Sequence, residues 1–279
     1  MARVLGLKQL LSKKYNFLEG LPDEITHCFG RLVNNFIMII WGNSGNGKSS
    51  FLMSFIKVLM PFGKILYVAL EEGFEATTQM NALRSLNEDE HSGKIEFADC
   101  DMNYDELVKK LKKKKSPRFI IIDSVQYWDI TYKKYKDLKQ MFKNKTFIFI
   151  SHATNKEPRG TVADSIRYDA GIKARVEGFM VDVKSRYGGN NPYVIWEEGA
   201  EKYWGKNYRT AISGAKETKK KKPKPTLKKT DEVLQQIHPA ESLAEPRESF
   251  LGERQVDGDS ERILSELVGN HAENVTEDL

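Results

Sequence analysis

Short apolar runs alternate with stretches of helical periodicity between residues 36 and 205. Each run is four to seven residues long and has no polar face, which predicts strands of a sheet that is covered on both sides. The predicted strands are residues 36–41, 64–70, 95–98, 119–123 and 146–151. This βαβα order predicts an α/β fold with a mainly parallel central sheet.

Helical patterns fill the segments between these runs. Residues 49–60 follow the first strand, and residues 103–115 place Leu107, Val108 and Leu111 on one face. The alternation of strand and helix patterns ends after Ser151, and residues 171–204 predict two or three further strands. Two of them, 178–186 and 193–196, are joined by a turn that contains Gly-Gly-Asn-Asn-Pro, which predicts an extra C-terminal β-hairpin.

The two ends of the chain have different patterns from the core, which we expect to span residues 36–210. Residues 1–35 form an N-terminal arm, in which Leu5, Leu7, Leu10 and Leu11 predict one helix that packs against the core or a neighbour. Residues 211–230 are a basic linker, with eight lysines and two prolines in 216–229, and this composition predicts disorder. Residues 231–279 form an acidic tail that we expect to be mostly disordered, with one short helix at 260–268 as an alternative.

Charge is distributed unevenly along the chain. The acidic tail has 13 acidic and 3 basic side chains, so residues 1–230 carry a net charge of +15 although the whole chain has +5. An excess of this size indicates a surface that meets phosphate. The tail either screens that surface or binds a protein partner, although an unstructured tail without such a role is the simpler interpretation.

Other functional classes are excluded by composition. No apolar run approaches the length of a membrane span, so we expect no membrane partner. The first residues lack the pattern of a secretory signal, which predicts a cytoplasmic location. Cys28 and Cys100 lie far apart, so neither a disulfide framework nor a four-cysteine zinc site is expected.

A phosphate-binding motif follows the first predicted strand. Residues 42–49, Gly-Asn-Ser-Gly-Asn-Gly-Lys-Ser, satisfy G-x-x-x-x-G-K-[S/T]. Backbone N–H groups of this loop and the N-terminus of the next helix converge on an anion, Lys48 neutralises the β and γ phosphates, and the Ser49 hydroxyl binds Mg²⁺. The implied ligands are therefore ATP and Mg²⁺. The predicted nucleotide contacts are Gly42, Asn43, Ser44, Gly45, Asn46, Gly47, Lys48, Ser49 and Ser50.

Carboxylates at two further strand ends complete a hydrolytic site. Asp123 ends an apolar strand that we expect beside the phosphate-loop strand, where it would orient the metal together with Ser49. Hydrolysis also needs a base that polarises water, and Glu71 and Glu72 stand at the tip of another predicted strand. Glu71 is the better placed of the two, Glu72 is the alternative, and an acidic loop without a catalytic role also fits this pattern.

Over residues 36–205 the chain resembles the RecA superfamily, most closely the branch with RadA and the DnaB-type ring helicases. Residues 64–73 are similar to a strand that ends in a catalytic glutamate, and Ile121-Ile122-Asp123-Ser124-Val125-Gln126 is similar to the Walker B segment of RadA. Residues 149–156 resemble the strand that senses the γ-phosphate, which gives His152 the sensor role. The pattern also resembles compact ATPases of this type that are carried by phages.

Residues 184–188, Lys-Ser-Arg-Tyr-Gly, are close to the Lys-Asn-Arg-Phe-Gly signature of RadA. The resemblance implies that Lys184 and Arg186 reach the nucleotide of a neighbouring subunit in a hexameric ring or filament. The chain lacks the zinc finger and protease-like domain of RadA and the helical N-terminal domain of replicative helicases. Substrate choice therefore does not carry over from these relatives.

The resemblance also places two loops, residues 127–134 and 153–170, beside bound DNA. Tyr127, Trp128 and Tyr132 offer aromatic faces, as single-strand binders require. Positive charge beside them comes from Lys133, Lys156, Arg159 and Arg167. Core packing of the tyrosines and solvated arginines is the competing interpretation.

Two functions remain open from the sequence. The leading hypothesis is an ATP-hydrolysing motor that acts on DNA in recombination, repair or replication. The alternative is a nucleotide-dependent oligomerisation switch or assembly factor that does not act on nucleic acid. A small-molecule P-loop kinase is a distant third hypothesis, because Lys184 and Arg186 lie on a late strand and not in a lid of the same chain.

Overall fold

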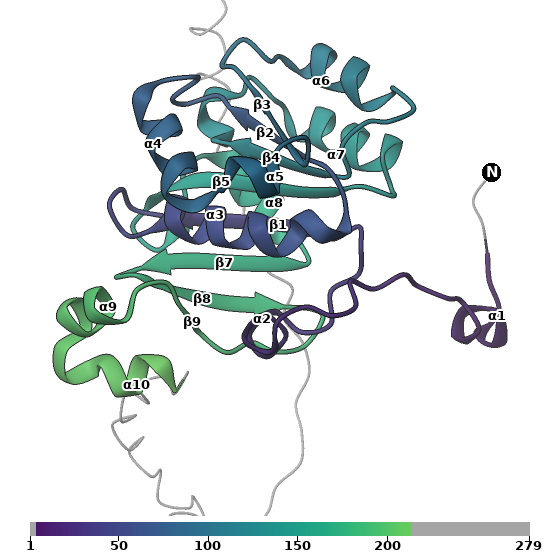
Figure 1. Cartoon of the computed structure of the whole chain (residues 1–279). Helices are drawn as coiled ribbons and strands as arrows, with labels where there is room; N and C mark the ends of the chain where they lie inside the picture. Colours follow the sequence, from purple (N-terminus) through teal and green to yellow (C-terminus); the bar gives the residue numbers. More distant parts are fainter. Residues whose placement is uncertain (1–3, 214–279) are drawn as a thin grey trace, which may run out of the picture. The chain divides into compact units, whose positions relative to one another are not determined.

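One sheet organises the fold of the computed structural model, which describes residues 4–213 (Figure 1). The strand order is β3-β2-β4-β5-β1-β7-β8-β9, and β6 pairs with the end of β5. The strands are β1 (Ile37–Gly42), β2 (Ile65–Ala69), β3 (Ile95–Ala98), β4 (Phe119–Asp123), β5 (Thr146–Thr154), β6 (Glu157–Pro158), β7 (Ile172–Glu177), β8 (Met180–Ser185) and β9 (Tyr193–Val194). The first six strands of this order are parallel, so the predicted α/β class with a mainly parallel sheet is confirmed.

Helices connect the parallel strands as the sequence pattern predicts. They are α1 (Leu7–Leu11), α2 (Asp23–Phe29), α3 (Lys48–Leu59), α4 (Ala76–Ser85), α5 (Glu88–His91), α6 (Tyr104–Leu111), α7 (Tyr132–Met141), α8 (Thr161–Asp169), α9 (Glu197–Trp204) and α10 (Tyr208–Ile212). Three 3₁₀ turns lie at Met60–Phe62, Val125–Tyr127 and Gly205–Asn207. Helix α6 ends four residues before the predicted boundary at residue 115, because Ser116-Pro117 follows and the residue before proline disfavours helical backbone.

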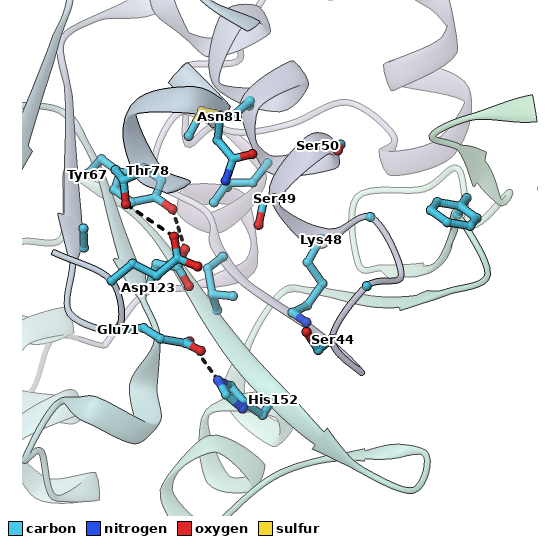
Figure 2. A pocket seen from close by; sticks show the side chains of 18 residues that line it. Ser44, Lys48, Ser49, Ser50, Tyr67, Glu71, Thr78, Asn81, Asp123 and His152 are labelled. Carbon is cyan, nitrogen blue, oxygen red and sulfur yellow. Dashed lines mark hydrogen bonds and ion pairs between the residues drawn. The ribbon is translucent and has the colours of Figure 1, made fainter. Parts of the chain in front are cut away.

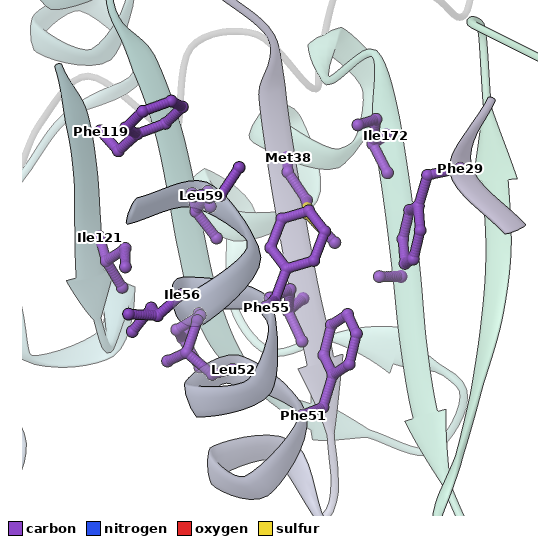
Figure 3. Packing of buried hydrophobic residues seen from close by; sticks show 14 of the residues in the cluster. Phe29, Met38, Phe51, Leu52, Phe55, Ile56, Leu59, Phe119, Ile121 and Ile172 are labelled. Carbon is purple, nitrogen blue, oxygen red and sulfur yellow. The ribbon is translucent and has the colours of Figure 1, made fainter. Parts of the chain in front are cut away.

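Two hydrophobic cores fill the space on either side of the sheet. Alternate residues of β1 point to opposite faces, as the period of a strand requires. Met38 and Ile40 pack with α3 and α2, and Figure 3 shows the α3 side chains Phe51, Phe55 and Leu59 against this face. The other face is covered by apolar side chains of α6, α7 and α8. All residues of β1 are therefore buried.

The C-terminal part of the sheet contains the predicted hairpin and one strand more. Strands β8 and β9 pair antiparallel across the predicted turn, and β7 pairs antiparallel with β8 on its other side. The tight turn between β7 and β8 is Gly178-Phe179, and both residues have a positive φ, as two-residue hairpin turns require. A Cβ atom at Gly178 would also lie 2.1 Å from the Tyr203 ring of α9, so glycine is needed there on both counts.

The N-terminal helix is shorter and less buried than the sequence predicts. Helix α1 has no buried residue, and Leu7, Leu10 and Leu11 are all more than half exposed. These leucines do not pack against the core of the same chain. The predicted basic linker and acidic tail lie almost wholly outside the described residues, and the domain boundaries at 36, 210 and 230 stay predictions.

Candidate functional site

A cavity of about 330 Å³ opens at the carboxyl edge of the sheet (Figure 2). The strand register explains why distant residues meet there, since Gly42 of β1 pairs with His152 of β5 and Ala69 of β2 pairs with Asp123 of β4. The structure brings nine predicted site residues together in the lining of this cavity. They are Ser44, Gly45, Gly47, Lys48, Ser49, Ser50, Glu71, Asp123 and His152.

The sequence motif at residues 42–49 forms a loop between β1 and α3. Gly45 and Gly47 have φ values of 76° and 95°, a left-handed backbone that favours glycine. Helix α3 begins directly after Gly47, so its free N–H groups face the cavity, which suits an anion. Lys48 Nζ lies 3.0 Å from the carbonyl oxygen of Asn43. Burial lowers the pKa of Lys48, while the charges of Asp123 and Glu71 oppose that shift.

Asn46 ties this loop to the turn of the C-terminal hairpin. Its Oδ1 accepts a hydrogen bond of 2.7 Å from the N–H of Gly178, and its carbonyl oxygen accepts one from the N–H of Phe179. Phe179 in turn packs edge-to-face on Trp196, with ring centroids 5.1 Å apart. The sequence motif predicts Asn46 only as a loop residue, and its link to the hairpin was not predicted.

Asp123 is held by a tyrosine that the sequence analysis missed. The hydroxyl of Tyr67, from the neighbouring strand β2, donates a hydrogen bond to Asp123 Oδ2. Burial raises the pKa of Asp123 to about 6, although the hydrogen bond from Tyr67 acts in the opposite direction. A divalent cation would offset this burial, so the carboxylate fits a metal ligand. The signal for Tyr67 was its polar tip within an otherwise apolar strand.

The two glutamates after β2 have different partners. Glu71 Oε2 lies 2.8 Å from His152 Nε2, and about a third of each side chain is exposed to the cavity. The backbone N–H of Glu71 donates to the carbonyl oxygen of Asp123, which fixes its position beside β4. Glu72 Oε2 accepts hydrogen bonds from Thr77 and Thr78 at the start of α4. The geometry therefore favours Glu71 as the group that meets the reacting centre.

Gln126, also absent from the predicted site, connects three segments around His152. Its Nε2 donates to Ser151 Oγ at 2.8 Å and to the carbonyl oxygen of Arg159 at 2.7 Å. Its Oε1 accepts a hydrogen bond of 3.1 Å from the N–H of His152. The segment after β4, the end of β5 and the connection from β6 to α8 are thus joined by one side chain.

Lys184 and Arg186 lie at the opposite edge of the sheet from this cavity. Strand β8 runs antiparallel to β7, so Lys184 pairs with Lys173, and the Arg186 N–H donates to the carbonyl oxygen of Gly171. The cavity end of β7 is marked by Val176, which pairs with Gly42. Five residues of strand separate Val176 from Gly171, a distance of about 17 Å at ~3.3 Å per residue. Arg186 therefore cannot reach the cavity of its own chain, and Lys184, which is opposite Lys173, lies three strand residues from Val176 toward the same far edge.

The predicted DNA contacts fall into two groups. Lys133, Lys156 and Arg159 are exposed. Arg167 is mostly buried and forms ion pairs of 3.1 Å with Glu157 and 2.7 Å with Asp164. Much of its charge is neutralised inside the chain.

The two predicted loops contain regular structure and one buried aromatic side chain. Trp128 is only 5% exposed and packs on Tyr104, so it has no free face for stacking. The segment 127–134 includes the start of α7, and 153–170 contains β6 and α8. For Trp128, core packing is therefore the interpretation that the structure supports.

Strand order also corrects one expectation about Asp123. We expected its strand to lie next to the strand that leads into the phosphate loop, but β5 lies between β1 and β4. This insertion brings His152 between the phosphate loop and Asp123. Within residues 4–213, no helix has the length and apolar character needed to cross a membrane.

Comparisons with known proteins give structural matches only. No family model and no curated protein matches the chain. It is similar to the solved structure of an ATPase domain, with 15% identity and a TM-score of 0.45 over 65% of this chain and 88% of that chain. It is also similar to the flagellar accessory protein FlaH from Methanocaldococcus jannaschii, with 18% identity and a TM-score of 0.46 over 65% and 95% of the two chains.

A KaiC-like protein from Pyrococcus horikoshii matches with 18% identity and a TM-score of 0.46, over 62% of this chain and 89% of that chain. The function proposed below rests on the geometry of the cavity and not on these matches.

Proposed function

We propose that this protein is an ATPase that acts on DNA as an assembly of several copies, with each ATP bound between two subunits. The observation that carries the proposal is the meeting of Lys48, Asp123 and the Glu71–His152 pair in one cavity at the carboxyl edge of the sheet. A phosphate loop with a carboxylate for a metal and a second carboxylate for water is the set that hydrolysis requires.

Each residue of the cavity has a distinct task in this proposal. The loop N–H groups and Lys48 bind the β and γ phosphates, and the lysine ammonium moves from the Asn43 carbonyl oxygen to the phosphate. Ser49 and Asp123 would hold Mg²⁺, which supplies positive charge to the phosphate oxygens. Glu71 accepts the proton of the attacking water at a carboxylate oxygen, and His152 orients that carboxylate.

The site within one chain lacks an arginine for the charge that develops on the γ-phosphate. No arginine lines the cavity among the described residues. Because Lys184 and Arg186 lie at the opposite edge of the sheet, they suit the cavity of an adjacent subunit, where a guanidinium would stabilise the transition state. Homo-oligomerisation, as a hexameric ring or a filament, follows from this role.

DNA contact is proposed for Lys133, Lys156 and Arg159. The Arg159 backbone N–H donates directly to the carbonyl oxygen of His152 at 2.8 Å, and Gln126 links the same two residues a second time, so movement of the DNA-binding segment can alter the position of the sensor. This connection supports an ATPase that responds to DNA. Such an activity would serve DNA recombination, repair or replication. The motifs resemble those of ATPases that phages carry.

The alternative function is a nucleotide-dependent oligomerisation switch or assembly factor without nucleic acid. Two observations favour it: Trp128 is buried, and Arg167 is neutralised by Glu157 and Asp164. The burial of Trp128 removes one aromatic face predicted to stack on bases, and the ion pairs of Arg167 remove one positive charge predicted to contact DNA. A protein partner bound through the acidic tail would fit this alternative.

ATP hydrolysis with and without single-stranded DNA, at stated salt concentrations, separates the two functions. Lys48→Ala should lose ATP binding, because the loop then has no mobile cation, whereas Lys57→Ala on the exposed side of the same helix should not. DNA should stimulate hydrolysis by the wild-type chain, and Lys156→Gln with Arg159→Gln should weaken that response. Hydrolysis that ignores DNA, in a chain that does not bind DNA, would support the switch.

A further inference from the structure

The amino edge of the sheet, opposite the ATP cavity, carries dense positive charge in two adjoining hollows of about 570 and 630 Å³. The first hollow is lined by Lys13, Lys136, Lys139 and Lys143. The second is lined by Arg118 and the run 112–114, all of which are lysines. Lys145 and Phe142 line both hollows, which are therefore adjacent. We call the nine cations of these hollows the basic edge.

Lys145 distinguishes the basic edge from an ordinary solvated lysine surface. It is 9% exposed and is the only buried lysine or arginine among the described residues. Its Nζ donates to the carbonyl oxygen of Pro117 at 2.5 Å and to Ser116 Oγ at 2.9 Å. No carboxylate within residues 4–213 forms an ion pair with it, and an ammonium has three protons to donate. A buried cation without a counter-ion is costly unless a ligand brings the anion.

Acidic residues do not neutralise the basic edge from within. Asp169 is the only acidic residue that lines either hollow. Its Oδ2 lies 2.6 Å from Lys139 Nζ and also accepts a hydrogen bond from Tyr135. After this pair is discounted, seven other cations face the hollows with Lys145. Their spread along one edge suits an extended polyanion better than a single phosphate.

We propose that the basic edge binds the phosphodiester backbone of nucleic acid, without regard to sequence. The chemistry fits this ligand because lysine ammonium groups bind phosphate oxygens as point charges. The nine cations also outnumber the five amide side chains that line the hollows, which are Asn16, Asn34, Asn35, Gln140 and Asn144. This inference rests on the proposed action on DNA. It adds a second contact surface, distinct from Lys133, Lys156 and Arg159.

The acidic segment 231–279 is the competing anion, since it has 13 acidic and 3 basic side chains. The eight lysines of residues 216–229 directly precede this segment in the sequence and are an alternative partner for its acidic side chains. A phosphodiester backbone is therefore the occupant that the charge distribution favours.

The test neutralises four exposed lysines of the basic edge in the full chain, Lys113→Gln, Lys114→Gln, Lys136→Gln and Lys143→Gln. Binding of a fluorescent single-stranded oligonucleotide of mixed sequence is measured without ATP, over a series of salt concentrations. Affinity should fall by roughly 10-fold or more, and the slope of log K against log salt should shrink by about two to three, because fewer phosphate contacts release counterions.

A matched control removes the same charge elsewhere, with Lys57→Gln, Lys94→Gln, Lys202→Gln and Lys206→Gln, all exposed and outside both hollows. Both variants should keep the unfolding temperature of the wild type. Equal loss of affinity in the two variants would reduce the effect to net charge and overturn the proposal. Unchanged DNA binding in the basic-edge variant would also overturn it, and tighter binding would overturn it and assign the surface to the acidic segment. Because ATP is absent, this outcome is independent of whether Lys48→Ala abolishes ATP binding.

Discussion

Two adjacent glutamates show how hydrogen-bond partners divide roles between side chains of the same chemistry. Glu72 accepts two threonine hydroxyl groups at the start of α4, so its carboxylate is engaged with the fold. Glu71 is held by His152 at the cavity, with its backbone fixed to Asp123. Position after β2 alone does not separate them, because consecutive residues after a strand end can turn to either side. The hydrogen-bond partners therefore support Glu71, and not Glu72, in the proposed role of base.

Glu71→Gln should leave ATP binding within a few-fold of the wild type and lower the hydrolysis rate by about 100-fold or more, since it removes the proton acceptor. The amide keeps the size of the carboxylate, and Lys48, Ser49 and Asp123 are untouched. Single-turnover hydrolysis with bound ATP measures this directly.

Glu72→Gln is the matched control. The amide oxygen still accepts from Thr77 and Thr78, so hydrolysis should change little. A large loss in Glu72→Gln with full activity in Glu71→Gln would assign the base to the other carboxylate.

At the scale of elements, strand β5 determines the architecture of the site. It lies between β1 and β4, and its C-terminal end brings Ser151 and His152 into reach of Gln126. Gln126 uses both N–H donors and its oxygen to join β5 to the connection before α8, in parallel with the backbone bond from Arg159 N–H to the His152 carbonyl oxygen. The nucleotide side and the exposed Arg159 side of the site are therefore mechanically linked.

Gln126→Met should weaken the link between the nucleotide side and the Arg159 side. The thioether chain keeps the length of the side chain but loses three hydrogen bonds, each worth about 1 kcal/mol, while the backbone bond from Arg159 to His152 remains. ATP affinity should stay near the wild-type value, whereas stimulation of hydrolysis by single-stranded DNA should fall. The ratio of rates with and without DNA measures the effect.

Gln79→Met, on the exposed face of α4, is the control for the substitution itself. It should retain the DNA response. Wild-type stimulation in Gln126→Met would show that the two sides communicate by another route.

The elements themselves were predictable, because buried parallel strands appear as apolar runs and the phosphate loop has a fixed spacing. The predicted strands at 95–98 and 119–123 agree with β3 and β4 at both ends. Strand order was not predictable, since an apolar run does not specify its neighbour. The burial of Trp128 and the contacts of Tyr67 and Gln126 depend on that order, so they were also missed.

At the scale of the whole molecule, the antiparallel direction of β8 separates the two halves of the proposed catalytic machinery. The turn before β8 contacts the phosphate loop through Asn46, while Lys184 and Arg186 lie at the other end of the strand. A single chain thus presents an ATP cavity at one edge of the sheet and a basic pair at the opposite edge. These two surfaces suit head-to-tail contacts between identical chains, which generate rings or filaments.

Arg186→Ala should fold and bind ATP, and its hydrolysis rate should fall by about 10³-fold, since the guanidinium stabilises charge on the leaving phosphoryl group. Mixing these chains with Glu71→Gln chains should restore part of the activity, because some interfaces then combine an intact Glu71 with an intact Arg186 of the neighbour. The steady-state rate of the mixture against either variant alone is the measurement.

Arg209→Ala provides a control, because Arg209 is exposed on α10 and outside the cavity. Mixed oligomers whose rate stays at the level of the separate variants would contradict a role between subunits. Full activity of a monomeric wild-type chain would contradict it as well.

In the proposed assembly, the separation of Arg186 from its own cavity would also make catalysis a function of protein concentration. A chain diluted below the dissociation constant of the assembly would keep its phosphate loop and Glu71 but lose the neighbour's guanidinium, so its specific activity should fall on dilution. The total rate of ATP hydrolysis would then increase more than linearly with protein concentration. Hydrolysis would become appreciable only where the local concentration allows assembly. The antiparallel direction of β8 would in this way make ATP hydrolysis depend on a threshold concentration of the protein.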